Sequence, residues 1–265
     1  MAKSLLPVQT FGEESIMRRI WAEIGQGLTI AIKDVRVYYL QPPMIMFGLL
    51  MPFFMFFSFS IGRGLGADTS VARLLALTTF FTASSAGPVI LPMERRIRTF
   101  DRLLVAPVSL VTVLLGKSLV GMIFGLAVSM IPLLAGLTIF RIVVADPLLL
   151  AVGLLGGSLA FSILGVLFAS VPAESPGAIM MPSTLVRWPL LFISGIFIPL
   201  EEMAPWARAV SYLSPLTYTQ DLLNYAILGN GAQSLTLDLV ALLLAVVVLL
   251  VPTLKLHDLS RRLGY

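Results

Sequence analysis

The 265-residue sequence predicts an all-α membrane protein with six transmembrane helices. The chain is 58% hydrophobic and only 12% charged, whereas about 25% of the residues are charged in soluble domains. Its mean hydropathy is +0.96. Apolar runs also recur at the length of about 20 residues that a helix needs to cross the hydrocarbon core of a bilayer. The six runs cover residues 44–61, 71–91, 108–140, 147–171, 178–198 and 235–254.

The composition also limits the chemistry that the chain can perform. Six spans and their connections use the whole length, so we expect one transmembrane domain over residues 1–265 and no soluble nucleotide-binding or catalytic domain. The sequence has no cysteine and a single histidine, His257, beyond the last apolar run. It also lacks the zinc and nucleophile motifs of proteases. We therefore expect no enzyme activity, no catalytic residue and no metal site in this chain.

The distribution of basic residues predicts the orientation in the membrane. Loops that stay in the cytoplasm carry an excess of Lys and Arg. Of the 18 Lys and Arg, twelve lie before the first run, between the second and third runs, or after the last; four lie in the opposite connections. We expect a multi-pass protein of the plasma (inner) membrane with both termini in the cytoplasm. The net charge of +4 then reflects this orientation and not a nucleic-acid site.

The N-terminal segment, residues 11–40, has an apolar stripe at helical spacing. Ile16, Ile20 and Ile24 begin the stripe, which continues to Val35, and charged residues lie off it. A helix with one apolar and one charged face lies along the membrane interface. The segment therefore predicts an amphipathic interfacial helix on the cytoplasmic surface of the bilayer.

The connection between the second and third spans, residues 93–107, is charged and ends at Pro107. Phe100 and Leu103 give it a small apolar face at helical spacing, which suits a groove on a partner protein. We predict a short cytoplasmic helix that couples the membrane domain to that partner; a solvated, positively charged loop is the alternative. The residues singled out for coupling are Glu94, Arg95, Arg96, Arg98, Thr99, Phe100, Asp101, Arg102 and Leu103.

Two basic residues fall inside apolar runs, where a charge costs about 2.5–3.5 kcal/mol at mid-span. Lys117 lies near the cytoplasmic start of its run, so we expect its long stem to carry the ammonium group to the headgroups. Arg187 lies close to the middle of its run, beside Trp188 and Pro189. We predict that it lines a pathway or a subunit interface; a contact with backbone carbonyls freed by Pro189 is the alternative.

Residues 199–224, between the fifth and sixth spans, are half apolar and contain two helix-start signals. Glu201 and Glu202 precede Pro205, and Pro215 forces a second break. We predict an outer re-entrant hairpin of two short helices that dip into the outer leaflet, with aromatic anchors at the interface. An ordinary surface loop is the alternative. The hairpin residues singled out are Pro199, Glu201, Glu202, Trp206, Tyr212, Pro215 and Tyr218.

Two runs of the sequence resemble those of ABC-2 type exporter permeases. The coupling segment is similar over Thr99, Asp101-Arg102-Leu103-Leu104 and Ala106-Pro107. The end of the fifth span and the outer hairpin are similar over Ser194-Gly195-Ile196-Phe197-Ile198-Pro199 and Tyr212-Leu213-Ser214-Pro215-Leu216-Thr217-Tyr218. One position departs from the family, because Arg98 stands before Thr99 where the family often has Gly.

The resemblance implies the permease subunit of an ATP-driven exporter. Such permeases work as pairs, here expected to be a homodimer in the lipid bilayer, with two copies of a separate ATP-binding subunit that holds ATP and Mg²⁺. The family exports drugs, lipids and glycan- or lipid-like amphipathic molecules. The alternative is a self-contained channel or secondary transporter. It is disfavoured by the absence from the sequence of an intramembrane carboxylate for ion coupling and of paired broken helices.

Overall fold

The computed structural model is helical throughout the residues that it describes, apart from turns and short connections, and no strand occurs among them. This result confirms the predicted all-α class for the described part of the chain. The described residues are 25–30, 32–34, 46–60, 64, 66–99, 109–171, 173 and 175–262. The helices are η1 (Met46–Leu50), α3 (Met51–Ser60), α4 (Ala67–Arg96), α6 (Leu110–Thr138), α7 (Pro147–Phe168), α8 (Pro176–Phe192), η2 (Leu200–Glu202), α9 (Pro205–Ser211), α10 (Pro215–Leu228) and α11 (Leu235–Arg262).

Four of these helices are long and apolar enough to cross a membrane: α4, α6, α7 and the Leu235–Ser260 part of α11. The helix formed by η1 and α3 and the 17-residue helix α8 are shorter. The predicted count of six spans is therefore not confirmed by the described helices, although η1–α3 lies within the first predicted span and most of α8 lies within the fifth.

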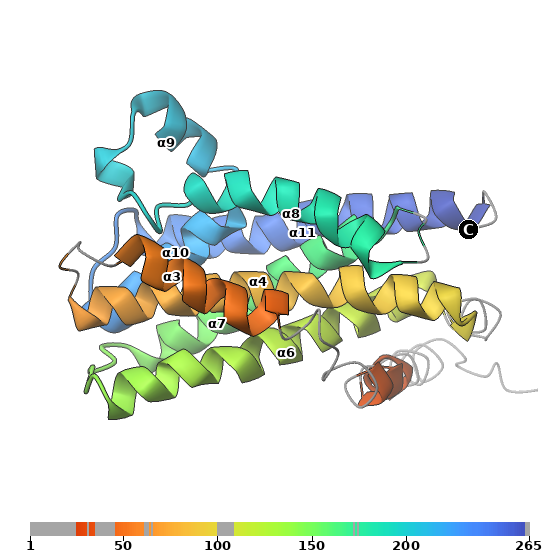
Figure 1. Cartoon of the computed structure of the whole chain (residues 1–265). Coiled ribbons are helices and arrows are strands. Elements are labelled where there is room, and N and C mark those ends of the chain that lie inside the picture. The colour runs from red at the N-terminus through yellow and green to blue at the C-terminus, as the bar shows by residue number, and fades with distance from the viewer. Residues whose placement is uncertain are drawn as a thin grey trace, which may run out of the picture.

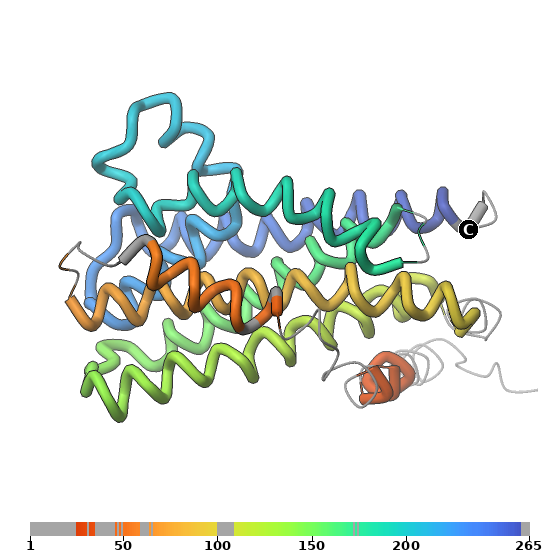
Figure 2. Tube along the Cα trace, viewed as in Figure 1, coloured from red at the N-terminus to blue at the C-terminus, as the bar shows by residue number. Residues whose placement is uncertain are grey.

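The long helices lie side by side and form a bundle with two distinct ends (Figures 1 and 2). At the hairpin end, shown on the left, α9 projects from the bundle, and α4 and α11 begin. At the opposite end, called the cluster end below, α4 and α11 finish and α6 and α8 begin. Helix α4 is the core of the bundle, because its most apolar stretch is 100% buried, whereas that of α11 is 11% buried.

Small residues allow α4, α6 and α7 to pack closely. A Cβ atom on Gly87 of α4 would lie 2.5 Å from the carbonyl group of Gly165 on α7, so the two backbones touch there. On α6, Gly121 faces Ser162 of α7, whose hydroxyl donates a 2.6 Å hydrogen bond to the carbonyl of Ser118. In membranes such small-residue contacts provide the close van der Waals packing that holds helices together.

Adding one methyl group at this packed surface is expected to destabilise the protein. A Cβ on Gly125 would lie 2.8 Å from the Cβ of Ala83, so Gly125→Ala should lower the free energy of unfolding by about 1–2 kcal/mol through overpacking. Gly177→Ala is the matched control, since a Cβ at Gly177 meets nothing within 4 Å. Thermal unfolding of the purified protein measures both, and an equal effect at the two positions would contradict the close packing.

Local signals in the sequence set several helix ends. The Ser109 hydroxyl accepts a 3.1 Å hydrogen bond from the Thr112 N–H and caps α6. The Asp146 carboxylate accepts bonds of 2.9 and 3.0 Å from the first N–H groups of α7. Helix α10 ends at Gly229, whose φ of 76° places it in the left-handed region that glycine tolerates.

The predicted separate helix over residues 93–107 is wrong at its beginning. Helix α4 continues through Glu94 and Arg95 to Arg96, so these residues extend the second predicted span instead of starting a new element. Pro92 lies inside α4, and the helix continues past it to Arg96. Residues 100–107 of this prediction, and most of the predicted 11–40 helix, lie outside the described residues; 25–30 and 32–34 are helical.

Candidate functional site

Four ionised side chains meet in a buried cluster at the cluster end of the bundle. Lys33 and Asp34 come from the N-terminal helical segment, Glu94 from the end of α4 and Lys117 from α6. The Lys117 Nζ atom contacts Asp34 Oδ2 and lies 2.5 Å from Glu94 Oε2. The Lys33 Nζ atom contacts Glu94 Oε1 and lies 2.7 Å from Asp34 Oδ1. Each cation therefore touches both anions.

Burial makes this ion cluster a strong constraint on the fold. Asp34 and Glu94 are fully buried and Lys117 is 2% exposed, whereas the Lys33 side chain is 42% exposed. Burial alone would lower the pKa of Lys33, but its hydrogen bonds to Asp34 and Glu94 raise that pKa above its ordinary value. Two positive and two negative charges balance, so the cluster ties three segments together without a net buried charge.

The expectation that Lys117 reaches the lipid headgroups is wrong. Its side chain is buried and paired with Asp34, which lies 83 positions away in the sequence. Composition identified a basic residue in an apolar run but gave no partner, because both anions come from other segments. The contact between Lys117 and Asp34 forms only in the tertiary structure, so a local sequence pattern does not predict it.

A second set of contacts joins α4 and α11 to the end of α7. The Arg95 guanidinium donates a 2.7 Å hydrogen bond to the Val171 carbonyl, just beyond α7. From α11, His257 Nε2 donates to the Val166 carbonyl at 3.0 Å, and the Ser260 hydroxyl donates to the Ser170 carbonyl at 3.1 Å. Adjacent residues of α4 thus connect to different neighbours: Glu94 to the N-terminal segment and α6, and Arg95 to the end of α7.

The residues after α4 turn sharply away from the helix axis. Arg98 has a φ of 55°, in the left-handed region where a side chain is strained and glycine is not. This conformation gives a physical reason for the glycine that the family often has at this position. Thr99 donates a 3.3 Å hydrogen bond to the Glu94 carbonyl, and Arg96 is exposed. The remaining predicted coupling residues, Phe100, Asp101, Arg102 and Leu103, lie outside the described residues.

Arg187 is fully buried between α8 and α4. Its Nη2 atom donates to the Ser84 carbonyl, its Nη1 atom lies 3.4 Å from the Ser85 hydroxyl, and the guanidinium carbon lies 5.6 Å from the centre of the Phe168 ring. In an α-helix the Ser84 carbonyl would accept the N–H of residue 88, which is proline and has none. Arg187 therefore supplies the donor that Pro88 removes from α4.

This contact refines the alternative interpretation of Arg187, a bond to a freed backbone carbonyl, while its role in a pathway or subunit interface stays a prediction. The carbonyl that it binds is freed by a proline of α4, not by Pro189 of its own helix. Its described neighbours belong to α4 and α7 of the same chain. The bond connects α8 to α4, although α8 has few other residues packed against the bundle and exposes large side chains such as Met181 and Leu185.

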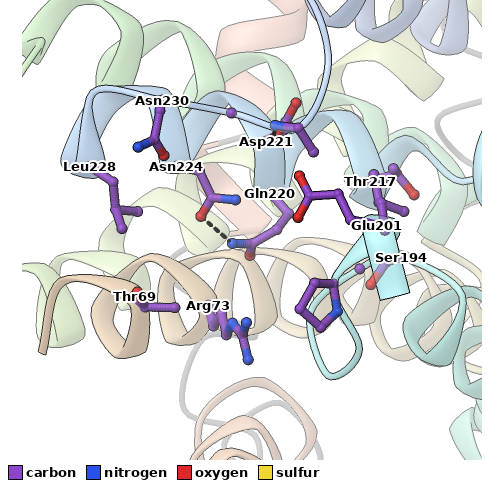
Figure 3. Close-up of a pocket in the computed structure, with 15 residues that line it drawn as sticks. Thr69, Arg73, Ser194, Glu201, Thr217, Gln220, Asp221, Asn224, Leu228 and Asn230 are labelled. Atoms are coloured by element: carbon purple, nitrogen blue, oxygen red, sulfur yellow. Dashed lines mark hydrogen bonds between the residues drawn. The ribbon is translucent and has the colours of Figure 1, made fainter. Parts of the chain in front are cut away.

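A polar cavity of about 370 Å³ lies at the hairpin end. It is lined by the first turns of α4, by α10, by the connection between α8 and α9 and by the loop after α10 (Figure 3). Its described lining residues with charged or polar side chains are Thr69, Arg73, Ser194, Glu201, Thr217, Gln220, Asp221, Asn224 and Asn230. The sequence interpretation did not predict this cavity, although it singled out Pro199 and Glu201, because the lining residues come from segments more than 100 residues apart.

The predicted hairpin residues divide between this cavity and the surface. Pro199 and Glu201 line the cavity. Trp206 of α9 is 73% exposed and Tyr212 is 42% exposed, as a residue in contact with a lipid interface would be. Of the remaining predicted hairpin residues, Glu202 is exposed, whereas Pro215 and Tyr218 are buried.

Comparison with known proteins shows that these features lie within a segment that matches one protein family. A family model described as ABC-2 type transporter matches residues 25–228, which contain the ion cluster, Arg187 and most of the polar cavity. Nodulation protein J of Neorhizobium galegae is 27% identical over 213 residues, which cover 73% of this chain and 78% of that protein.

Proposed function

Because the chain belongs to the ABC-2 type transporter family, a family of membrane transport subunits, we propose that it is the permease of an ATP-driven exporter. In this proposal two copies of the chain form the membrane part as a homodimer. Two copies of a separate ABC ATP-binding subunit bind and hydrolyse ATP with Mg²⁺. The exported molecule is an amphipathic, glycan- or lipid-like compound or a drug.

We further propose six crossings of the plasma (inner) membrane. The helix formed by η1 and α3, together with α8, adds two crossings to the four long helices, and in Figure 1 both lie alongside the bundle. The excess of basic residues assigns the cluster end and both termini to the cytoplasm. The hairpin end, with α9 and the polar cavity, then faces outward.

The buried ion cluster is the observation that carries the proposed mechanism. Glu94 joins the end of α4 to the N-terminal helical segment and to α6, two residues before the chain leaves α4. A push on the coupling segment that follows would therefore move these three elements as one unit. Arg187 provides a route from α4 to α8 through the Ser84 carbonyl. Motion that begins at the ATP-binding subunit would therefore reach α4 and, through Arg187, α8.

Charge reversal in the coupling segment tests this function. In a membrane preparation that contains the chain and its ATP-binding subunit, Asp101→Lys combined with Arg102→Glu should abolish co-purification of the subunit or uncouple ATP hydrolysis from transport. The physical reason is that the contact with the subunit depends on charge complementarity. Pull-down and ATPase assays in proteoliposomes measure the two effects.

Glu202→Lys is the control, since this exposed residue lies at the hairpin end, away from the coupling segment. Full coupling in the double variant would contradict the role assigned to the segment. Transport by the purified chain without ATP or a partner would favour a self-contained channel or secondary transporter instead.

A further inference from the structure

The polar cavity has a buried floor and an exposed rim. Ser194, Thr217 and Gln220 are 1%, 1% and 4% exposed, and they form its buried part. Glu201 and Asn230, by contrast, are exposed. Figure 3 shows Gln220 and Asn224 of α10 above Arg73 of α4. The volume of about 370 Å³ lies within the range of small-molecule binding sites, about 300–1,000 Å³.

Gln220 is the strongest sign of a ligand site. Its Nε2 atom donates a 2.8 Å hydrogen bond to Asn224 Oδ1, whereas its buried Oε1 atom has no hydrogen-bond partner among the described residues. A buried amide oxygen without a donor is costly. The side chain is thus fixed by Asn224 and presents a free acceptor to the cavity.

The two hydroxyl groups of the floor also act as acceptors. Ser194 donates its hydroxyl hydrogen to the Leu191 carbonyl at 2.6 Å, and Thr217 donates to the Ser211 carbonyl at 2.7 Å. A hydroxyl that has used its hydrogen can still accept hydrogen bonds. The buried floor therefore suits a ligand with several O–H or N–H donors. An anion without such donors cannot form hydrogen bonds to these acceptors.

The charges around the cavity likewise disfavour an anion. Arg73 supplies one positive charge and Glu201 one negative charge at the cavity wall. The carboxylate of Asp221 already accepts hydrogen bonds of 2.7 and 2.8 Å from the N–H groups of Ala232 and Gln233, which fixes the loop after α10. No aromatic side chain is among the described lining residues, so the cage that favours a quaternary ammonium group is missing.

We propose that this cavity binds a neutral, hydroxyl-rich group about the size of a sugar ring. The hydroxyl hydrogens of the ligand bond to Gln220 Oε1, Ser194 and Thr217, while Asn224 and Arg73 donate to its oxygens. The inference rests on the proposed export function for its biological meaning: at the outward end, the cavity holds the hydroxyl-rich part of the substrate as it leaves. The group belongs either to a free saccharide or to the headgroup of a glycolipid.

The test measures binding to the full-length chain in lipid nanodiscs, with its ATP-binding subunit, prepared without a sugar-based detergent. Methyl glucoside and maltose are the free probes, and monoglucosyl diacylglycerol in the nanodisc is the lipid probe. Glycerol 3-phosphate and choline are the charged comparators. Saturation-transfer NMR follows the free probes, and native mass spectrometry follows the lipid. We expect saturable binding of the neutral sugar group and no saturable binding of the charged comparators.

Gln220→Leu should weaken this binding about tenfold, because it removes the free acceptor and the bond that fixes Asn224. Gln233→Leu is the matched control, as its amide does not line the cavity, and it should bind as the wild type does. If Gln220→Leu does not fold, Asn224→Leu makes the same test at a less buried position.

The outcomes separate the two sources and the two proposals. Binding of the glycolipid alone assigns the site to a lipid headgroup, and binding of the free sugars assigns it to a saccharide; both support the inferred chemistry. Tighter binding of glycerol 3-phosphate or choline, or unchanged sugar binding in the Gln220 and Asn224 variants, overturns it. ATP-coupled transport without sugar binding would contradict the sugar site and support the export function. Sugar binding without any coupling to ATP would support the site and contradict the export function.

Discussion

Lys117→Met is expected to lower the free energy of unfolding by about 3–5 kcal/mol, the cost of removing one partner from a buried ion pair. The change leaves Asp34 and Glu94, both fully buried, to share the partly exposed Lys33. One negative charge is then buried without a partner. Thermal unfolding in detergent, followed by size-exclusion chromatography of the heated samples, measures the loss.

A compensating variant separates charge balance from side-chain size. Lys117→Met combined with Asp34→Asn leaves one cation and one anion, Lys33 and Glu94, so it should recover a large part of the lost stability. Lys255→Met is the control, because Lys255 is exposed on α11 and belongs to no described ion pair. Wild-type stability of the single variant at Lys117 would show that the cluster is not a buried, paired network.

The ion cluster also shows what the sequence could predict at this end of the protein. Apolar runs predicted helices at the positions of α4 and α6, because a run of about 20 apolar residues has few other solutions in a bilayer. The partners of Lys117 were not predictable in the same way. Asp34 and Glu94 lie in segments that the sequence assigned to an interfacial helix and to a cytoplasmic coupling helix, and their pairing depends on how the N-terminal segment packs.

The polar cavity was missed for a related reason. Its residues come from the start of α4, from the connection between α8 and α9, from α10 and from the loop after α10, and only the tertiary fold brings these stretches together. The sequence assigned Glu201 to a helix start and gave no role to Gln220 or Asn224. A useful signal was present in α10, where Gln220 and Asn224 are one helical turn apart on a buried surface.

Arg187 was recognised from its position in an apolar run, but its partner was not. A local rule would have found the partner: a proline inside a long helix leaves the carbonyl four residues earlier without its donor. Pro88 therefore marks Ser84, and a buried arginine elsewhere in the chain is a suitable donor. What the rule cannot give is the packing of α8 against α4 that brings the two together across 103 positions.

Arg187→Met should lower the free energy of unfolding by about 1.5–3 kcal/mol, the value of a hydrogen bond from a charged donor. Methionine keeps much of the side-chain volume but leaves the buried Ser84 carbonyl without a partner. Adding Pro88→Ala in the same chain returns an N–H group to α4, four residues after Ser84. The double variant should therefore regain more stability than Pro88→Ala gains in the wild type, by about 1–2 kcal/mol of coupling.

Pro92→Ala in the Arg187→Met chain is the matched control, because it removes a second proline from the same helix and improves helix propensity to the same degree. The N–H group that it adds faces the carbonyl of Pro88, which no described bond connects to Arg187. It should give no coupling energy. Thermal unfolding of the three single and two double variants provides both comparisons. Equal coupling for Pro88 and Pro92 would contradict the assignment of Arg187 as the donor to Ser84, since only Pro88 controls that carbonyl.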